Sequence, residues 1–135
     1  MDTQALYTTA HAVYSLHYHL VLVTKYRRRV LSPDMLARFA AIADQTTAQW
    51  GGRLHECNGE TDHVHVLVTL PPQVASSRFV NNLKTVTSRR LRREFPGLRG
   101  AYRDKAVLWT ASYFVSSAGG APLEVLKQYV QNQGT

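Results

Sequence analysis

The sequence contains a single cysteine, Cys57, among its 135 residues. One thiol excludes an internal disulfide and any zinc site made of several cysteines. No apolar run approaches the roughly 20 residues that a membrane-spanning helix needs. Residues 1–10 also lack the basic-then-apolar order of a signal peptide. These absences predict a cytoplasmic protein with no membrane partner.

Acidic residues are scarce as well, since 9 Asp and Glu oppose 16 Lys and Arg and give a formal net charge of +7. The positive residues are concentrated in two segments. They are Lys25, Arg27, Arg28 and Arg29, and then Arg78, Lys84, Arg89, Arg90, Arg92 and Arg93. A solvated helix face is the ordinary explanation of one basic run. Two such clusters in a short chain favour a nucleic-acid partner, and the charge leaves DNA and RNA equally open.

The apolar pattern and the length predict one domain over residues 1–135, with no repeat and no second domain. Alternating and β-branched residues predict strands over residues 13–24, 53–57, 63–70 and 107–115. The middle two are expected to join through a turn around Asn58-Gly59. Helical spacing predicts helices that begin at Ser32-Pro33 and Ser76-Ser77 and end near Gly51-Gly52 and Pro96-Gly97.

The predicted order of these elements is βαββαβ, followed by one more helix after Pro122. This order is typical of an α+β, ferredoxin-like (RRM-like) fold, in which an antiparallel sheet carries both helices on one face. We therefore expect a core over about residues 13–116 and a separate C-terminal helix over about residues 121–133.

Strand periodicity places His63 and His65 on one face and the valines that alternate with them on the other. The valines form a natural core face against the helices, so the histidines should lie on the open face of the sheet. Two imidazoles at this spacing can bind one metal ion, although ordinary hydrogen-bonded histidines show the same short pattern. His17 and His19 repeat it on the first strand, so spacing by itself does not identify which pair binds metal.

In the expected C-terminal helix, Tyr129 and Gln133 lie one turn apart beside an apolar stripe. A tyrosine in such a place is usually a core or interface residue, and spacing does not mark it as catalytic. Gly119 and Gly120 precede this helix, where they form either an ordinary turn or a hinge.

Taken together, the motifs resemble the single-tyrosine transposases of the smallest bacterial insertion sequences, the TnpA-like branch of the HUH endonucleases. The resemblance covers roughly residues 14–133. Its segments, in the family's order, are Tyr18-His19-Leu20-Val21, Thr24-Lys25-Tyr26-Arg27-Arg28, Thr61-Asp62-His63-Val64-His65-Val66-Leu67, Phe79-Val80-Asn81-Asn82-Leu83-Lys84, Ser88-Arg89-Arg90-Leu91-Arg92, Leu108-Trp109, Ser112-Tyr113-Phe114 and Gly119-Gly120-Ala121-Pro122-Leu123-Glu124-Val125 with Tyr129 and Gln133. Each segment is weak evidence, whereas the ordered set is specific.

The resemblance implies a DNA transposase that cuts and rejoins single-stranded DNA at the ends of an insertion sequence, through a 5′-phosphotyrosine intermediate. It implies that Tyr129 is the nucleophile, that His63, His65 and Gln133 bind the metal, and that His17 and His19 have supporting roles. Phosphate and water ligands favour Mg²⁺ or Mn²⁺. The family also implies a homodimer, hairpin-containing DNA ends, and a pivot at Gly119 and Gly120.

For DNA binding, we expect Tyr26 to stack on a base while Lys25, Arg27 and Arg28 hold phosphates. The second helix is expected to grip a DNA hairpin through its basic side chains. They are Lys84, Arg89, Arg90, Arg92 and Arg93. Two alternatives stay open: a domesticated relative that processes repeated palindromes, and a ferredoxin-like module that binds nucleic acid without cutting it. Such modules usually carry aromatic residues on the open face, where this chain is expected to carry His63 and His65.

Overall fold

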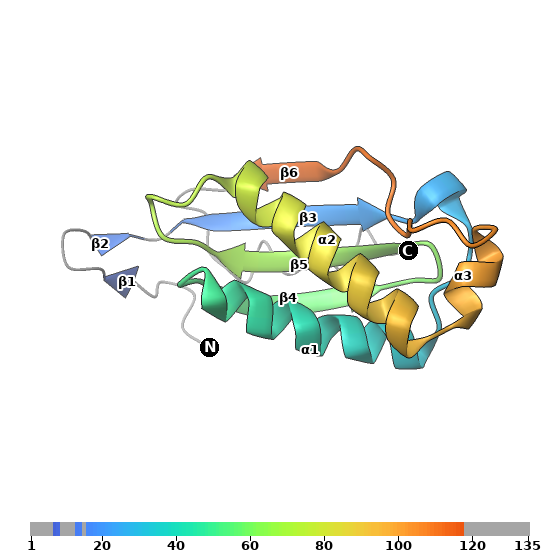
Figure 1. Ribbon diagram of the computed structural model, residues 1–135. Coiled ribbons are helices and arrows are strands. Elements are labelled where there is room, and N and C mark those ends of the chain that lie inside the picture. The colour runs from blue at the N-terminus through green and yellow to red at the C-terminus, as the bar shows by residue number, and fades with distance from the viewer. Residues whose placement is uncertain (1–6, 9–12, 15, 118–135) are drawn as a thin grey trace.

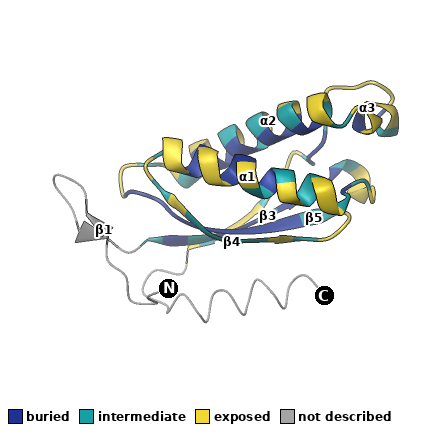
Figure 2. Ribbon diagram, turned by 90° about the horizontal axis from the view of Figure 1, so that it is seen from below, coloured by how far each residue is buried: buried dark blue, intermediate teal, exposed yellow. Residues whose placement is uncertain are grey.

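The computed structural model describes residues 7–8, 13–14 and 16–117. Its main elements are β3 (His17–Val23), α1 (Pro33–Gln49), β4 (Arg53–Gly59), β5 (His63–Thr69), α2 (Ser76–Glu94) and β6 (Phe114–Ser117). The four strands form one antiparallel sheet in the order β4-β5-β3-β6 (Figure 1). Both long helices cover the same face of this sheet (Figure 2). The predicted ferredoxin-like α+β fold is therefore confirmed.

Four short elements complete the described chain. They are β1 (Tyr7–Thr8), β2 (Val13–Tyr14), the 3-10 helix η1 (Lys25–Arg27) and α3 (Gly97–Ala101). The strand predicted over residues 13–24 is consequently divided, because β2 pairs with β1 and not with the main sheet. None of the described helices combines the length and the apolar character needed to cross a membrane. The expected C-terminal helix lies outside the described residues.

The core forms between the helices and the even-numbered face of β3 and β5. Leu20, Leu22 and the three valines of β5 (Val64, Val66 and Val68) are fully buried there. They pack with apolar residues that the two helices contribute at near-helical spacing. These are Phe39, Ile42 and Ala43 from α1 and Phe79, Val80, Leu83 and Leu91 from α2. Because side chains alternate along a strand, the odd-numbered residues, histidines included, lie on the opposite face.

The ends of α1 agree with the sequence prediction. The Ser32 hydroxyl accepts a hydrogen bond from the backbone nitrogen of Met35 at 3.2 Å, and Pro33 is the first helical residue. After the last helical residue, Gly51 takes a left-handed φ of 79°. α2 begins at Ser76, as predicted, but neither Ser76 nor Ser77 can act as its N-cap, because both are helical residues; the N-cap is Ala75, and no side chain caps the helix.

The hairpin between β4 and β5 turns later than expected, since β4 continues through Gly59 and the backbone nitrogen of Glu60 donates to the His63 carbonyl. Gly59 is required for close packing and not for a turn. A Cβ there would lie 2.7 Å from Leu36 Cδ2 and 2.9 Å from the His63 carbonyl oxygen.

The strand predicted over residues 107–115 is reduced to one bridge between Trp109 and Thr24, and β6 begins at Phe114. The apolar residues at the start of this segment reflect packing and not a strand ladder, because the neighbours Leu108 and Trp109 both lie in the core. Trp109 is buried in the core, and its indole nitrogen donates to the Thr87 hydroxyl at 3.0 Å. A loop that fills the core is therefore as apolar as a strand would be.

Candidate functional site

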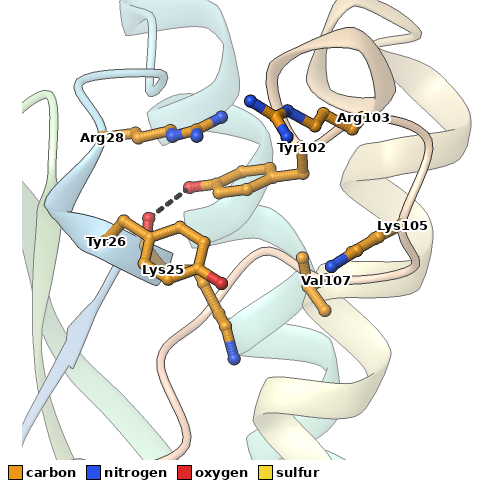
Figure 3. A pocket seen from close by; sticks show the side chains of 7 residues that line it. All are labelled: Lys25, Tyr26, Arg28, Tyr102, Arg103, Lys105 and Val107. Atoms are coloured by element: carbon orange, nitrogen blue, oxygen red, sulfur yellow. Dashed lines mark hydrogen bonds between the residues drawn. The ribbon is translucent and has the colours of Figure 1, made fainter.

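The turn that follows β3 carries four of the predicted DNA-binding residues. Tyr26 and Arg27 adopt left-handed φ values of 60° and 51°, and the Tyr26 side chain is 70% exposed. The guanidinium of Arg28 lies 5.5 Å from the centre of the Tyr26 ring and 5.3 Å from that of Tyr102 (Figure 3). Arg28 also donates to the carbonyl of Ala101. The structure therefore brings this turn against the segment that follows α3.

The face of the sheet opposite the helices holds a cluster of imidazoles, formed by His63 and His65 of β5 and His19 of β3. The rings of His63 and His65 meet edge to face, with their centres 4.8 Å apart. His19 stacks on His65 at 5.8 Å, and Phe114 of β6 contacts His19 edge to face at 5.7 Å. Periodicity correctly placed the histidines on this face. The face was also expected to be open to solvent, but the His65 side chain is buried, at 1% exposure.

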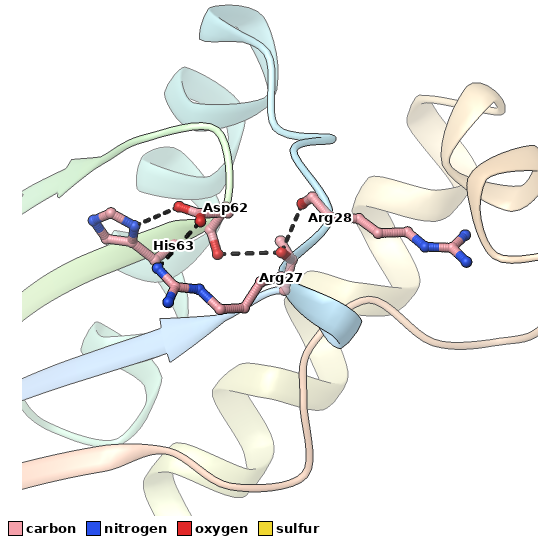
Figure 4. A network of polar contacts seen from close by, with 5 residues as sticks. Arg27, Arg28, Asp62 and His63 are labelled. Carbon is pink, nitrogen blue, oxygen red and sulfur yellow. Dashed lines mark hydrogen bonds and ion pairs between the residues drawn. The ribbon is translucent and has the colours of Figure 1, made fainter.

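The DNA-binding turn and the histidine cluster are joined through Asp62. One carboxylate oxygen of Asp62 lies 2.7 Å from His63 Nδ1, and the other lies 3.4 Å from Arg27 Nη2 (Figure 4). The hydrogen bond from His63 is the main reason that the pKa of Asp62 lies below its usual value. On the other side of the turn, the Thr24 hydroxyl donates to the carbonyl of Arg28. These bonds hold the turn beside the first residue of β5.

The Asp62 contact determines which nitrogen of His63 is available for a ligand. When Nδ1 donates to the carboxylate, Nε2 of the neutral ring carries the lone pair. This Nε2 is buried and has no hydrogen-bond partner among the described residues. An imidazole whose second nitrogen donates to a carboxylate is the usual arrangement of a metal-binding histidine. His63 therefore fits a divalent metal ion, with His65 adjacent to it.

Within the described part of the chain, no group of three or more His, Cys, Asp or Glu side chains is arranged to hold a metal ion. A site built on His63 and His65 would thus need a ligand from elsewhere. The predicted third ligand, Gln133, lies outside the described residues, as do Tyr129 and the predicted hinge at Gly119 and Gly120.

A second pair of histidines is held by a threonine on the same face. The Thr69 hydroxyl lies 2.8 Å from His17 Nδ1 and 2.6 Å from His55 Nε2. The pairing register of β4 with β5 shifts next to His55, which is the irregularity of a β-bulge. Burial lowers the pKa of His17, and likewise that of His19, which favours neutral imidazoles. The two histidines of β3 thus have different partners: His17 contacts Thr69, and His19 stacks on His65.

Lys84, predicted to bind DNA, is engaged within the protein. Its ammonium donates to the carbonyls of Thr110 and Ala111, each at 2.8 Å, and lies 5.5 Å from the centre of the Tyr113 ring. Burial lowers the pKa of this lysine. These contacts anchor the loop before β6 to α2, so the structure gives Lys84 a structural role.

The arginines of α2 are divided between two environments. Arg90 points toward α1, where it donates to Gln45 at 3.1 Å and lies 3.8 Å from Glu94. Arg89, Arg92 and Arg93, near the end of the helix, line a pocket of about 320 Å³. Pro96 and Arg99 complete its lining. Four guanidinium groups around one hollow form a surface suited to phosphate groups.

Sequence reasoning assigned no role to Asp62 or Tyr102. For Asp62 a signal was present, because a carboxylate immediately precedes a His-x-His motif. Tyr102 had none, since its contact with the Lys25 segment depends on the tertiary packing of α3. Burial raises the pKa of Cys57 to about 12, which agrees with an unreactive thiol packed against the core.

The fold and this cluster define an α+β protein with a ferredoxin-like sheet, two helices on one face and a histidine site on the other. Residues 12–133 match the family model described as "Transposase IS200 like". The chain belongs to this family and is a DNA transposase. The resemblance found in the sequence is thereby confirmed.

Two curated relatives span most of this chain. The transposase for insertion sequence element IS200 of Salmonella typhimurium is 27% identical over 124 residues, which cover 92% of this chain and 80% of that protein. The ISDra2 transposase TnpA of Deinococcus radiodurans is 31% identical over 121 residues, covering 90% of this chain and 86% of the relative.

Solved structures show the same architecture. A protein from Deinococcus radiodurans R1 superposes with a TM-score of 0.76 at 31% identity, over 96% of this chain and 98% of the other. A REP-associated tyrosine transposase bound to a REP hairpin gives a TM-score of 0.59 at 10% identity, over 92% of this chain and 68% of that one. The second likeness concerns the fold alone.

Proposed function

We propose that this transposase cleaves and rejoins single-stranded DNA, with Tyr129 as the nucleophile and a divalent metal bound by His63, His65 and Gln133. The observation that carries the proposal is the state of His63. Its Nδ1 is held by Asp62, and its buried Nε2 has no hydrogen-bond partner among the described residues. The family match extends through residue 133 and so includes both tail residues.

In the proposed reaction, the phenolic oxygen of Tyr129 loses its proton and attacks the scissile phosphorus. The new bond joins the tyrosine to the 5′-phosphate, the bond to the 3′-oxygen breaks, and that oxygen takes up a proton and leaves as a 3′-hydroxyl. A 3′-hydroxyl then loses its proton and attacks the phosphorus of the phosphotyrosine. The new bond reseals the strand, the bond to the tyrosine oxygen breaks, and the tyrosine regains its proton. Because the phosphotyrosine retains the bond energy, neither step needs ATP.

Mg²⁺ or Mn²⁺, when bound, would polarise the scissile phosphate and neutralise charge that develops on its oxygens. The imidazoles of His63 and His65 would hold the ion, and Asp62 would keep the His63 ring in the orientation that ligation requires. Ligation by Gln133 would complete the protein's share. Two imidazoles and one amide oxygen leave coordination positions for the substrate, as in other catalytic metal sites.

The basic surfaces of the described chain support a DNA substrate. Lys25, Tyr26 and Arg27 lie in the turn that Asp62 ties to His63, so DNA bound there would approach the proposed metal site. On α2, Arg89, Arg92 and Arg93 with Arg99 form a separate basic surface, which we assign to the stem of a DNA hairpin. A structural neighbour of this fold is a transposase bound to a REP hairpin.

We further propose that the transposase acts as a homodimer in which the tyrosine helix of either subunit can complete a metal site. Gly119 and Gly120 would form the pivot of that helix. Size-exclusion chromatography with light scattering tests the dimer, and a monomer at the concentrations used for cleavage would refute it.

The experiment that tests the reaction is a denaturing gel of labelled single-stranded DNA taken from the flanks of the gene that encodes this chain. Wild type is compared with Tyr129→Phe and with the double variant His63→Ala/His65→Ala, in Mg²⁺ or Mn²⁺ and in chelator. We expect a metal-dependent covalent protein–DNA band in wild type that both variants lack. If all three proteins bind these strands and none cleaves them, a nucleic-acid-binding module without catalysis explains the fold better.

A further inference from the structure

A pocket of about 380 Å³ lies where the turn after β3 meets the segment after α3 (Figure 3). Its volume is in the range of small-ligand sites, about 300–1,000 Å³. The lining residues come from two segments distant in sequence. They are Lys25, Tyr26 and Arg28, and then Tyr102, Arg103, Lys105 and Val107. This lining combines four cations and two aromatic rings, and it includes no carboxylate.

The two walls of the pocket are tied together without a ligand. The Tyr102 hydroxyl donates to the backbone carbonyl of Lys25 at 3.0 Å, and the backbone nitrogen of Lys25 donates to the carbonyl of Leu108 at 2.8 Å. Arg28 donates to Ala101 and lies against both tyrosine rings. The cavity is therefore preorganised, and Arg28 and Tyr102 belong to its framework.

Tyr26 differs from this framework because its ring faces solvent. A left-handed backbone is unfavourable for a non-glycine residue, and such conformations concentrate at binding sites. At Tyr26 the strained backbone presents an aromatic ring that is 70% exposed. Lys25 lies 5.6 Å from the centre of this ring. An exposed ring bordered by cations is the combination that binds single-stranded nucleic acids by base stacking.

We propose that this pocket binds one unpaired nucleotide of the DNA. The base stacks on Tyr26, and the phosphate lies among Lys25, Arg103 and Lys105. This inference rests on the proposed function, because it takes single-stranded DNA as the substrate. It adds a particular nucleotide site with a second wall, residues 102–107, that no sequence motif indicated. Arg27, in the same turn, donates a hydrogen bond to Asp62, which in turn contacts His63. The bound nucleotide therefore belongs to the DNA strand that reaches the proposed metal site.

Equilibrium binding to abasic DNA tests the pocket separately from catalysis. The probe is a fluorescein-labelled DNA hairpin with single-stranded flanks from beside the gene, and chelator is present throughout so that no metal-dependent cleavage occurs. Each unpaired position is replaced in turn by an abasic site. At one position we expect wild type to lose affinity about tenfold, the usual scale of one base–aromatic stack. Tyr26→Ala should bind the intact DNA about tenfold more weakly and be insensitive to the abasic site at that position, whereas Tyr26→Phe should behave as wild type.

A pair of charge-matched variants tests the phosphate side of the pocket. Lys105→Ala removes a cation from the lining, and Arg29→Ala removes one exposed cation outside it. We expect Lys105→Ala to weaken binding more than Arg29→Ala does. Circular dichroism and thermal unfolding show whether each variant is folded.

The outcomes separate this inference from the proposed function. If wild type cleaves DNA with metal, but no abasic site lowers its affinity in a way that depends on Tyr26, the nucleotide pocket is wrong and the transposase reaction stands. If abasic sites cost nothing while Lys105→Ala weakens binding, the pocket holds phosphate without a base, and the proposal is wrong. If one abasic site lowers the affinity of wild type but not of Tyr26→Ala, and no metal-dependent cleavage occurs, the pocket is supported and the proposed reaction is refuted. No binding of the probe by wild type would overturn both.

Discussion

The Asp62→Asn substitution removes the charge that orients His63 while leaving an amide oxygen that can still accept a hydrogen bond. In the protein, the Asp62 carboxylate lies 2.7 Å from His63 Nδ1 and 3.4 Å from Arg27. Loss of such a partner of a metal-binding histidine typically costs about 10–100-fold in metal affinity, or about 1.4–2.8 kcal/mol. Because asparagine keeps the acceptor, we expect about tenfold for Asp62→Asn, and about 100-fold for Asp62→Ala.

The assay is a titration of the protein with Mn²⁺ in the absence of DNA, with the free ion measured by electron paramagnetic resonance. Asp44→Asn is the matched control, since it removes one exposed carboxylate from α1 and changes the net charge equally. Its Mn²⁺ affinity should equal that of wild type. Thermal unfolding without metal verifies that Asp62→Asn retains the fold.

Two results would refute different parts of this reasoning. If His63→Ala abolishes Mn²⁺ binding and Asp62→Asn leaves it unchanged, His63 binds the ion without needing Asp62 for orientation. If His63→Ala itself binds Mn²⁺ as tightly as wild type, His63 is not a ligand, and the metal site proposed above is wrong.

Three further predictions concern the tail, the loop before β6 and the contact between the helices. Gln133→Ala should raise the Mg²⁺ concentration needed for cleavage more than it weakens DNA binding, and an unchanged cleavage curve across a Mg²⁺ titration would remove Gln133 from the site. Lys84→Met should lower the free energy of unfolding, measured by chemical denaturation, by about 1–2 kcal/mol, because two carbonyls lose a charged donor. Its loss of DNA affinity should not exceed that of Arg29→Ala. Unchanged stability with a larger loss of DNA affinity than Arg29→Ala would identify Lys84 as a DNA contact. The pKa of Glu94 is lowered chiefly by its hydrogen bond from Arg38. The ionised carboxylate therefore stabilises the fold at pH values above the pKa that it has in the unfolded chain. This stabilisation is lost as the pH falls through the lower pKa of the folded protein. Glu94→Gln should therefore reduce the melting temperature at neutral pH and not at strongly acidic pH, and an equal reduction at both would contradict the ion-pair explanation.

Much of this protein was determined by local sequence pattern. Alternation along residues 63–69 placed the valines in the core and the histidines on the opposite face, because successive side chains of a strand point in opposite directions. Ser32-Pro33 determined the start of α1, because a hydroxyl cap and a fixed φ act within one turn. The ordered motifs indicated the transposase family that the comparisons then established.

Local pattern misled where a loop is as apolar as a strand. Leu108 and Trp109 are apolar because both fill the core beneath a loop, and an apolar run does not distinguish a buried loop from a paired strand. Composition also assigned one role to Lys84 and the arginines of α2, although their surroundings differ. Packing directs the Lys84 ammonium to two loop carbonyls and Arg90 toward α1.

Tertiary structure by itself decided how the site is assembled. Strand register made His19 and His65 diagonal neighbours whose rings stack, and the register shift in β4 accompanies the contact of His55 with the Thr69 hydroxyl. The packing of α3 brought Tyr102 to the carbonyl of Lys25 and so formed the second wall of the pocket. These contacts join residues far apart in the chain, and their geometry depends on the whole sheet and core. Periodicity, by contrast, acts over a few neighbouring residues, which is why it placed the histidines on a face and left their partners to the fold.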